Sequence, residues 1–209
     1  MTSKYKIFPI YDNEKYDLVV NDYFVFIQIP KTSSTNVLKK CKDLDLTRKL
    51  SCYRHEGLEY LETIINIRVP VYAIVRNPYR QIHSWFFFKL RDGYLKINNN
   101  LDIVQNFEIF VKEQINNIHL NQCKYIKSNK NIQVKIFKYE ENKFNNYLIK
   151  NHNIDLKLNE THYNTNELKY LCTTPIKEFF RNKDILNLIK NSKKEEFQKF
   201  QYSDDINDL

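Results

Sequence analysis

The segment of residues 24–36, FVFIQIPKTSSTN, constrains the fold of this chain more than any other part. Its apolar and β-branched residues predict a buried strand over residues 23–29, which Pro30 ends. One lysine and four hydroxyl residues follow directly, within a helical pattern over residues 32–44. The first backbone N–H groups of a helix have no intrahelical acceptor and face the positive end of its dipole. The segment therefore predicts an anion-binding site.

Strand and helix patterns alternate along the rest of the chain. A second buried strand is predicted over residues 69–75, where β-branched residues dominate. Asn77 then offers an N-cap, Pro78 suits the first helical turn, and Gly93 ends the helix. The remaining predicted elements are a long helix at 101–127, a strand at 132–139, and helices at 141–150 and 175–200. This alternation predicts an α/β fold with a mainly parallel central sheet flanked by helices.

The length of 209 residues predicts a single domain over residues 1–209 that buries a sizeable core. The N-terminus lacks the apolar run of a signal peptide, and no stretch of about 18 apolar residues predicts a membrane span. The four cysteines are widely spaced without a C-x-x-C pair, which is typical of free thiols in a reducing compartment. We therefore expect a soluble cytoplasmic protein, in the host cytoplasm if the source is viral.

The scarcity of glycine excludes two common kinds of phosphate-binding site. A nucleotide-triphosphate P-loop needs G-x-x-x-x-G-K-[ST], and a dinucleotide fold needs G-x-G-x-x-G, because glycine lets the backbone wrap the phosphates. The chain has only Gly57 and Gly93, neither near Lys31, so both site types are excluded. What remains is a glycine-free site made of the Lys31 side chain, the N–H groups of residues 32–36 and the hydroxyls of Thr32, Ser33, Ser34 and Thr35. The alternative is a hydroxyl-rich helix cap without a ligand.

A second group of candidate residues begins where the strand over residues 69–75 ends. Arg76 lies at that strand end, and Arg80 and Ser84, four residues apart, share one helix face. Only seven of the 33 basic residues are arginines. Because the chain otherwise prefers lysine, each arginine is a good candidate for a contact that needs the planar guanidinium, which can bind two oxygens at once. Ligands of parallel sheets bind beyond the carboxyl ends of the strands, where Lys31 and Arg76 are both expected. The group predicts a second phosphate contact; exposed arginines beside a helix cap are the alternative.

In their order and spacing these motifs resemble the P-loop-like sulfotransferases that use 3′-phosphoadenosine-5′-phosphosulfate (PAPS), especially the carbohydrate O-sulfotransferase branch. In that family a P-K-T-x-[ST]-T-type loop holds the 5′-phosphosulfate, and this chain has PKTSST there. A later strand ends in an arginine- and proline-containing stretch with a following serine that holds the 3′-phosphate, matched here by Arg76 and Ser84. Segments 134–141, 158–165 and 195–202 are similar to the family's later strand, adenosine loop and closing aromatic helix. The resemblance covers about residues 20–203.

The resemblance implies a three-layer P-loop NTPase-like fold and transfer of a sulfuryl group from PAPS to a hydroxyl acceptor, with a glycan favoured. It assigns the 5′-phosphosulfate to Lys31, to the hydroxyl residues at 32–35 and to Asn36, and the adenosine loop to His162 and Asn164. Lys31 is also catalytic in this scheme, because it neutralises charge on the departing 3′,5′-ADP. No metal is implied.

A neutral hydroxyl acceptor needs a general base, and histidine titrates closest to neutral pH. His55 lies between the two phosphate motifs, where the resembling enzymes often carry a catalytic histidine, so it is the predicted base. Glu56 or Glu59 is the fallback. His119 and His152 lie in polar surroundings and are predicted to be solvated.

Two other functions remain open at this point. A net charge of +8 allows a nucleic-acid-binding protein, but the lysines are scattered and balanced by 25 acidic residues, so no nucleic-acid partner is expected. The other is a catalytically inactive member of the same fold that binds PAP-like nucleotides. The sequence also leaves open whether the acceptor is a sugar, a tyrosine or a small alcohol, and what the oligomeric state is.

Overall fold

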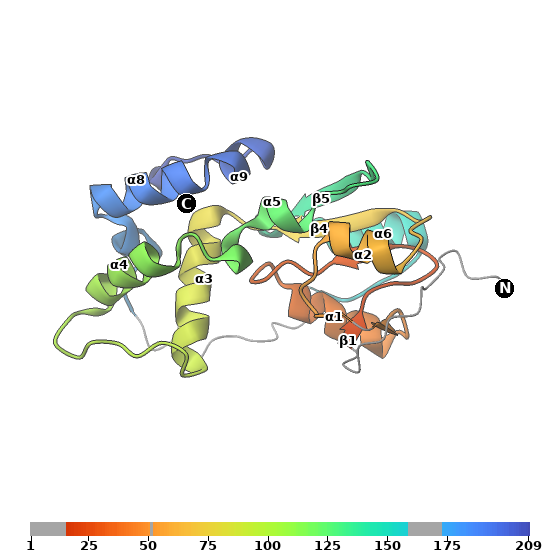
Figure 1. Cartoon of the computed structure of the whole chain (residues 1–209), viewed down its shortest axis with the longest axis horizontal. Helices are drawn as coiled ribbons and strands as arrows, with labels where there is room; N and C mark the ends of the chain where they lie inside the picture. Colours follow the sequence, from red (N-terminus) through yellow and green to blue (C-terminus); the bar gives the residue numbers. More distant parts are fainter. Residues whose placement is uncertain (1–15, 51, 159–172) are drawn as a thin grey trace. The chain divides into compact units, whose positions relative to one another are not determined.

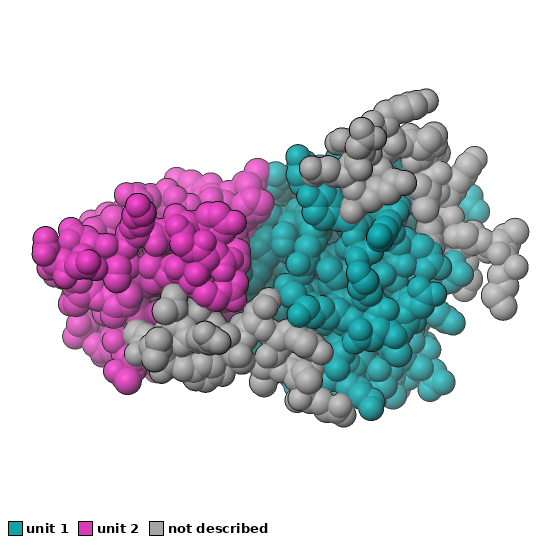
Figure 2. Space-filling model, turned by 90° about the horizontal axis from the view of Figure 1, so that it is seen from below, with its two compact units in different colours: residues 1–75, 122–163 teal, residues 76–121, 164–209 magenta. Residues whose placement is uncertain are grey.

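The computed structural model describes residues 16–50, 52–158 and 173–209, which contain the elements labelled in Figure 1. The chain divides into two compact units, coloured separately in Figure 2. The first unit comprises residues 1–75 and 122–163, and the second comprises residues 76–121 and 164–209. That residues 1–209 act as a single domain stays a prediction.

A small parallel sheet lies at the centre of the first unit (Figure 1). Its strands β2 (Val25–Ile27), β4 (Val71–Val75) and β5 (Val134–Lys138) lie in the order β2-β4-β5, and both pairings are parallel. The three predicted strands are confirmed, and with the flanking helices they make a mixed α/β fold. A separate antiparallel pair, β1 (Tyr16–Leu18) with β3 (Arg48–Leu50), is not anticipated by the sequence pattern.

The two longest helices of the first unit pack on one face of this sheet. They are α1 (Ser34–Asp43) and α6 (Phe144–His152). The unit also has three shorter elements: the helices α2 (Leu58–Ile64) and α5 (Gln122–Tyr125) and the 3-10 turn η2 (Tyr139–Glu141). Alternate strand residues, Phe26 and Tyr72 among them, form one core cluster with Val37 of α1 and Leu148 of α6. All residues of β2 and β4 are buried, as expected for strands covered on both faces.

The second unit is helical. Its elements are α3 (Pro78–Arg91), α4 (Ile103–Gln114), η1 (Ile118–Leu120), η3 (Ile176–Phe180), α8 (Lys183–Ser192), α9 (Lys194–Lys199) and η4 (Ile206–Asp208). The start of α3 is confirmed as predicted, because the Asn77 side chain accepts a hydrogen bond from the Tyr79 N–H at 3.0 Å and Pro78 is its first residue. Trp85, Phe86 and Phe87 are buried in an aromatic core. None of the described helices is long and apolar enough to cross a membrane.

The long helix predicted over residues 101–127 is wrong as a single element. The helix α4 ends at Gln114, and η1 and α5 follow as separate short turns. The Asn117 side chain accepts a hydrogen bond from the His119 N–H at 3.0 Å and starts a new turn. Asparagine side chains compete in this way with the helical backbone pattern, which apolar spacing alone does not reveal.

Three of the four cysteines lie in the described residues, and all three are buried free thiols: Cys41, Cys52 and Cys123. Burial raises the pKa of Cys41 and of Cys52 to about 12. These thiols are therefore protonated at neutral pH and act as small apolar side chains. Cys172 lies outside the described residues.

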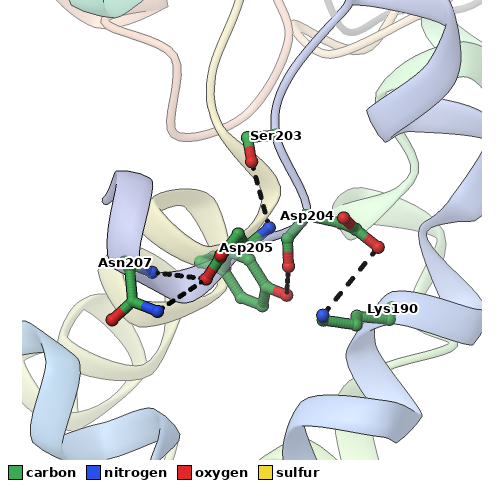
Figure 3. A network of polar contacts seen from close by, with 6 residues as sticks. Lys190, Ser203, Asp204, Asp205 and Asn207 are labelled. Carbon is green, nitrogen blue, oxygen red and sulfur yellow. Dashed lines mark hydrogen bonds and ion pairs between the residues drawn. The ribbon is translucent and has the colours of Figure 1, made fainter.

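The C-terminal segment of the second unit is tied to the first turn of α3 (Figure 3). The buried Tyr79 hydroxyl donates a hydrogen bond to the Asp204 carbonyl oxygen at 2.8 Å. Nearby, the Asp205 carboxylate accepts from the Asn207 backbone and side chain, both at 2.9 Å, and Lys190 Nζ lies 3.9 Å from the Asp204 carboxylate. The tyrosine hydroxyl is thus the buried polar link between the two segments.

We expect the substitution Tyr79→Phe to lower the free energy of unfolding by about 1 kcal/mol, because it removes one buried hydrogen bond while keeping the ring. Urea unfolding of the full chain measures this free energy in the variant and in the unchanged protein. The matched control is Tyr94→Phe, since Tyr94 is 70% exposed and should have almost no effect. Equal stabilities of the two variants would contradict the anchoring role.

Candidate functional site

The loop that leaves β2 has a backbone conformation that non-glycine residues rarely adopt. Lys31 has a φ of 65° and Ser33 a φ of 70°, both in the left-handed region. Thr32 lies between them and is buried, and its hydroxyl donates a hydrogen bond to the Ile29 carbonyl oxygen at 2.9 Å. Backbone turns of this kind bring successive N–H groups together into a concavity that suits an anion.

Four consecutive backbone donors are available in this loop. Among the described residues, no acceptor is bonded to the N–H groups of residues 32–35. The first bonds of α1 come from Asn36 and Val37, whose N–H groups both donate to the Ser33 carbonyl oxygen. The Ser33 side chain forms no cap of its own. The start of α1 therefore combines these N–H groups with the hydroxyls of Ser33 and Thr35, directly after Lys31 in the chain. That this group of residues binds an anion stays a prediction.

The parallel pairing of the strands fixes where this loop begins. Ile27 of β2 pairs with Ala73 of β4, so the carboxyl ends of both strands lie at the same edge of the sheet. The loop of residues 28–33 follows directly from that edge. Ligands of parallel α/β sheets bind at this edge, which agrees with the predicted position of the anion site.

Arg54 is a member of this site that sequence reasoning missed. Its Nη2 donates to the Thr35 hydroxyl at 2.8 Å, and its Nε donates to the Gln28 side-chain oxygen at 3.1 Å. Burial lowers the pKa of this half-buried guanidinium from its usual value. The sequence offered one indication of such a role, because arginine is rare in this lysine-rich chain and each arginine is therefore a candidate for a specific contact. That indication does not say which arginine reaches the loop.

His55, the predicted base, is held by the same strand end. Its Nδ1 lies 2.6 Å from the Gln28 carbonyl oxygen. A carbonyl oxygen only accepts, so Nδ1 carries the hydrogen and Nε2 of the neutral ring is the proton acceptor. The two fallback bases differ in their surroundings. Burial raises the pKa of Glu56 while Lys124 opposes the shift, and Glu59 forms an ion pair with Lys127 at 3.1 Å.

The predicted residues of the second phosphate contact belong to the second unit. Arg76 directly follows β4 in the chain, and Arg80 and Ser84 lie one turn apart on α3. Within the described ranges, neither the Arg80 nor the Ser84 side chain makes a hydrogen bond or an ion pair. Both are half-buried. Their role as phosphate ligands stays a prediction, as does that of Arg76.

The other histidines are placed as follows. His83 is buried, with its ring centroid 4.7 Å from that of Phe179. His119 is exposed, as predicted. The prediction of a solvated His152 is wrong, because its Nε2 lies 2.8 Å from the Tyr72 hydroxyl and its burial lowers its pKa. The predicted adenosine-loop residues His162 and Asn164 lie outside the described residues.

Compared with models of protein families, with curated proteins and with solved structures, the chain matches none. The motifs and the geometry of residues 28–36, 54 and 55 are therefore the features that indicate its function.

Proposed function

We propose that this protein is a sulfotransferase that moves the sulfuryl group of PAPS to a hydroxyl acceptor, with a glycan as the favoured acceptor. The observation that carries the proposal is the loop of residues 31–35. It combines a lysine, four hydroxyl residues and four backbone N–H groups that are bonded to no described acceptor, at the carboxyl edge of a parallel sheet. The proposal includes the finer fold assignment, a three-layer P-loop NTPase-like architecture.

The chemistry of the loop supports a phosphosulfate more than a triphosphate. A glycine-rich P-loop encloses its phosphates with backbone, and a metal ion neutralises much of their charge. Here the left-handed Lys31 and Ser33 give the turn without glycine, and the half-buried hydroxyls of Ser33 and Thr35 offer donors for individual ligand oxygens. Such a loop suits an anion of moderate charge held by many hydrogen bonds.

The roles of Lys31 and His55 follow from the direction of charge movement. In the transfer, a bond forms between the acceptor oxygen and sulfur while the bond from sulfur to the bridging phosphate oxygen breaks. His55 Nε2 takes the proton of the acceptor hydroxyl, and Nδ1 stays bonded to the Gln28 carbonyl oxygen. Lys31 stabilises the negative charge that grows on the bridging oxygen. The products are a sulfate ester, 3′,5′-ADP and the proton on His55.

Transfer is tested with PAPS and a panel of oligosaccharides, tyrosine peptides and simple alcohols, with release of 3′,5′-ADP as the readout. Release that depends on one acceptor class supports the proposal and identifies the acceptor. Binding of 3′,5′-ADP without release in any mixture would instead indicate a nucleotide-binding protein of the same fold. A protein that binds nucleic acid but not 3′,5′-ADP would overturn the proposal.

Arg76, which directly follows β4 in the chain, is the predicted contact to the 3′-phosphate and gives a separate prediction. Arg76→Ala is expected to weaken 3′,5′-ADP binding about tenfold or more, because a charge-assisted hydrogen bond to phosphate contributes about 1.5–3 kcal/mol. Calorimetry measures the affinity. Arg181→Ala is the control, since Arg181 forms an ion pair with Glu178 at 2.9 Å that an alanine should remove at little cost. An unchanged affinity in Arg76→Ala would remove this assignment.

A further inference from the structure

The charge of Arg54 is not balanced by any described residue. Its two hydrogen bonds go to neutral oxygens, those of Gln28 and Thr35. In residues 16–50, 52–158 and 173–209, no carboxylate forms an ion pair with it. A guanidinium is always protonated in proteins, so a half-buried cation lies next to the loop, and none of the described residues supplies its counter-charge. Partial burial of an unpaired charge is costly, which favours an anionic ligand as the missing partner.

The hydrogen bonds of Arg54 also fix its direction. Arginine has five N–H donors, and the bonds to Gln28 and Thr35 use two of them. Because Thr35 lies in the first turn of α1, the guanidinium is held against the same turn that presents the backbone donors. The other N–H groups are therefore available for a ligand at the loop.

Gln28 positions both neighbours at once. Its side-chain oxygen accepts from Arg54 Nε, and its backbone carbonyl oxygen accepts from His55 Nδ1. Gln28 is almost fully buried at 1% exposure, so it has little freedom to move. One residue at the end of β2 thus holds the cation and the predicted base in a fixed relation to the loop.

We propose that the Arg54 guanidinium is a second cationic contact, beside Lys31, for the oxyanion bound at residues 31–35. This assignment rests on the proposed function, in which that oxyanion is the phosphosulfate end of PAPS. A planar fork can contact two oxygens of a tetrahedral group, whereas Lys31 acts as a point charge. Arg54 and Lys31 together would therefore orient the transferred group and also neutralise its negative charge.

The test is the affinity of the full chain for inorganic pyrophosphate, whose two bridged tetrahedral groups mimic a phosphosulfate. Calorimetry compares the unchanged protein with Arg54→Gln and Gln28→Glu. Arg54→Gln removes the cation, and Gln28→Glu keeps it but supplies a neighbouring carboxylate that competes with the ligand. Arg48→Gln is the matched control, because Arg48 is half-buried in the same unit and bonds to the Thr47 carbonyl oxygen.

We expect Arg54→Gln and Gln28→Glu each to weaken pyrophosphate binding about tenfold or more, with Arg48→Gln nearly unchanged and Arg54→Lys intermediate. Circular dichroism verifies that each variant is folded, and Gln28→Glu decides the matter if Arg54→Gln does not fold. Equal affinities of Arg54→Gln and Arg48→Gln, or no pyrophosphate binding by the unchanged protein, would overturn the inference. Arg54-dependent pyrophosphate binding without 3′,5′-ADP binding or PAPS turnover would overturn the proposed function while keeping the oxyanion contact.

Discussion

Replacing Lys31 with alanine is expected to lower the rate of sulfuryl transfer from PAPS about a hundred- to a thousandfold. Loss of one preorganised group that stabilises developing charge has an effect of this size in other enzymes. The left-handed backbone of Lys31 directs the chain into the turn that precedes α1, so the residue lies directly before the start of that helix. The effect should fall mainly on kcat, because the charge on the bridging oxygen grows only in the transition state.

The matched control for Lys31→Ala is Lys49→Ala, which removes an exposed lysine of β3 in the same unit. It changes the net charge equally and should leave the rate unchanged. A Lys31→Ala variant with the kcat of the unchanged protein would exclude Lys31 from the transfer step. A loss confined to KM would show that Lys31 only binds the donor.

Replacing His55 with alanine is the second large change, with an expected fall in kcat of about a hundred- to ten-thousandfold. The hydrogen bond from Nδ1 to the Gln28 carbonyl oxygen leaves Nε2 as the acceptor, so the neutral ring is the active form. Added imidazole should restore part of the activity of the variant.

Binding of 3′,5′-ADP distinguishes a base from a structural residue. His55→Ala should bind 3′,5′-ADP as tightly as the unchanged protein, because a general base acts on the acceptor and not on the nucleotide. His119→Ala, which removes an exposed histidine, should retain full activity. Full activity in His55→Ala would transfer the role of the base to another group, with Glu56 as the next candidate.

The parts of the fold that local chemistry determines could be predicted from the sequence. The buried strand β4 follows from an unbroken β-branched run, and the start of α3 follows from Asn77 and Pro78. The turn between β2 and α1 could be anticipated because Pro30 ends a strand pattern and hydroxyl residues follow. Each of these features is determined by residues that are close together in the sequence.

Features that depend on distant residues could not be predicted. Arg54 contacts Gln28 and Thr35, which lie 26 and 19 residues away, and no local pattern marks that contact. The left-handed conformation of Ser33 is unfavourable for an isolated serine, so only the folded loop specifies it. Likewise, the hydrogen bond between His152 and Tyr72 joins residues 80 positions apart. The polar residues next to His152 in the sequence therefore led to the wrong prediction that its side chain is solvated.

The most direct test of the central claim is a calorimetric titration of the full chain with 3′,5′-ADP, compared with 5′-AMP under the same conditions. A site for the PAPS nucleotide predicts saturable binding of one 3′,5′-ADP per chain. It also predicts an affinity for 5′-AMP about tenfold lower or more, because 5′-AMP lacks the 3′-phosphate. Absence of 3′,5′-ADP binding, or equal affinities for the two nucleotides, would contradict the account.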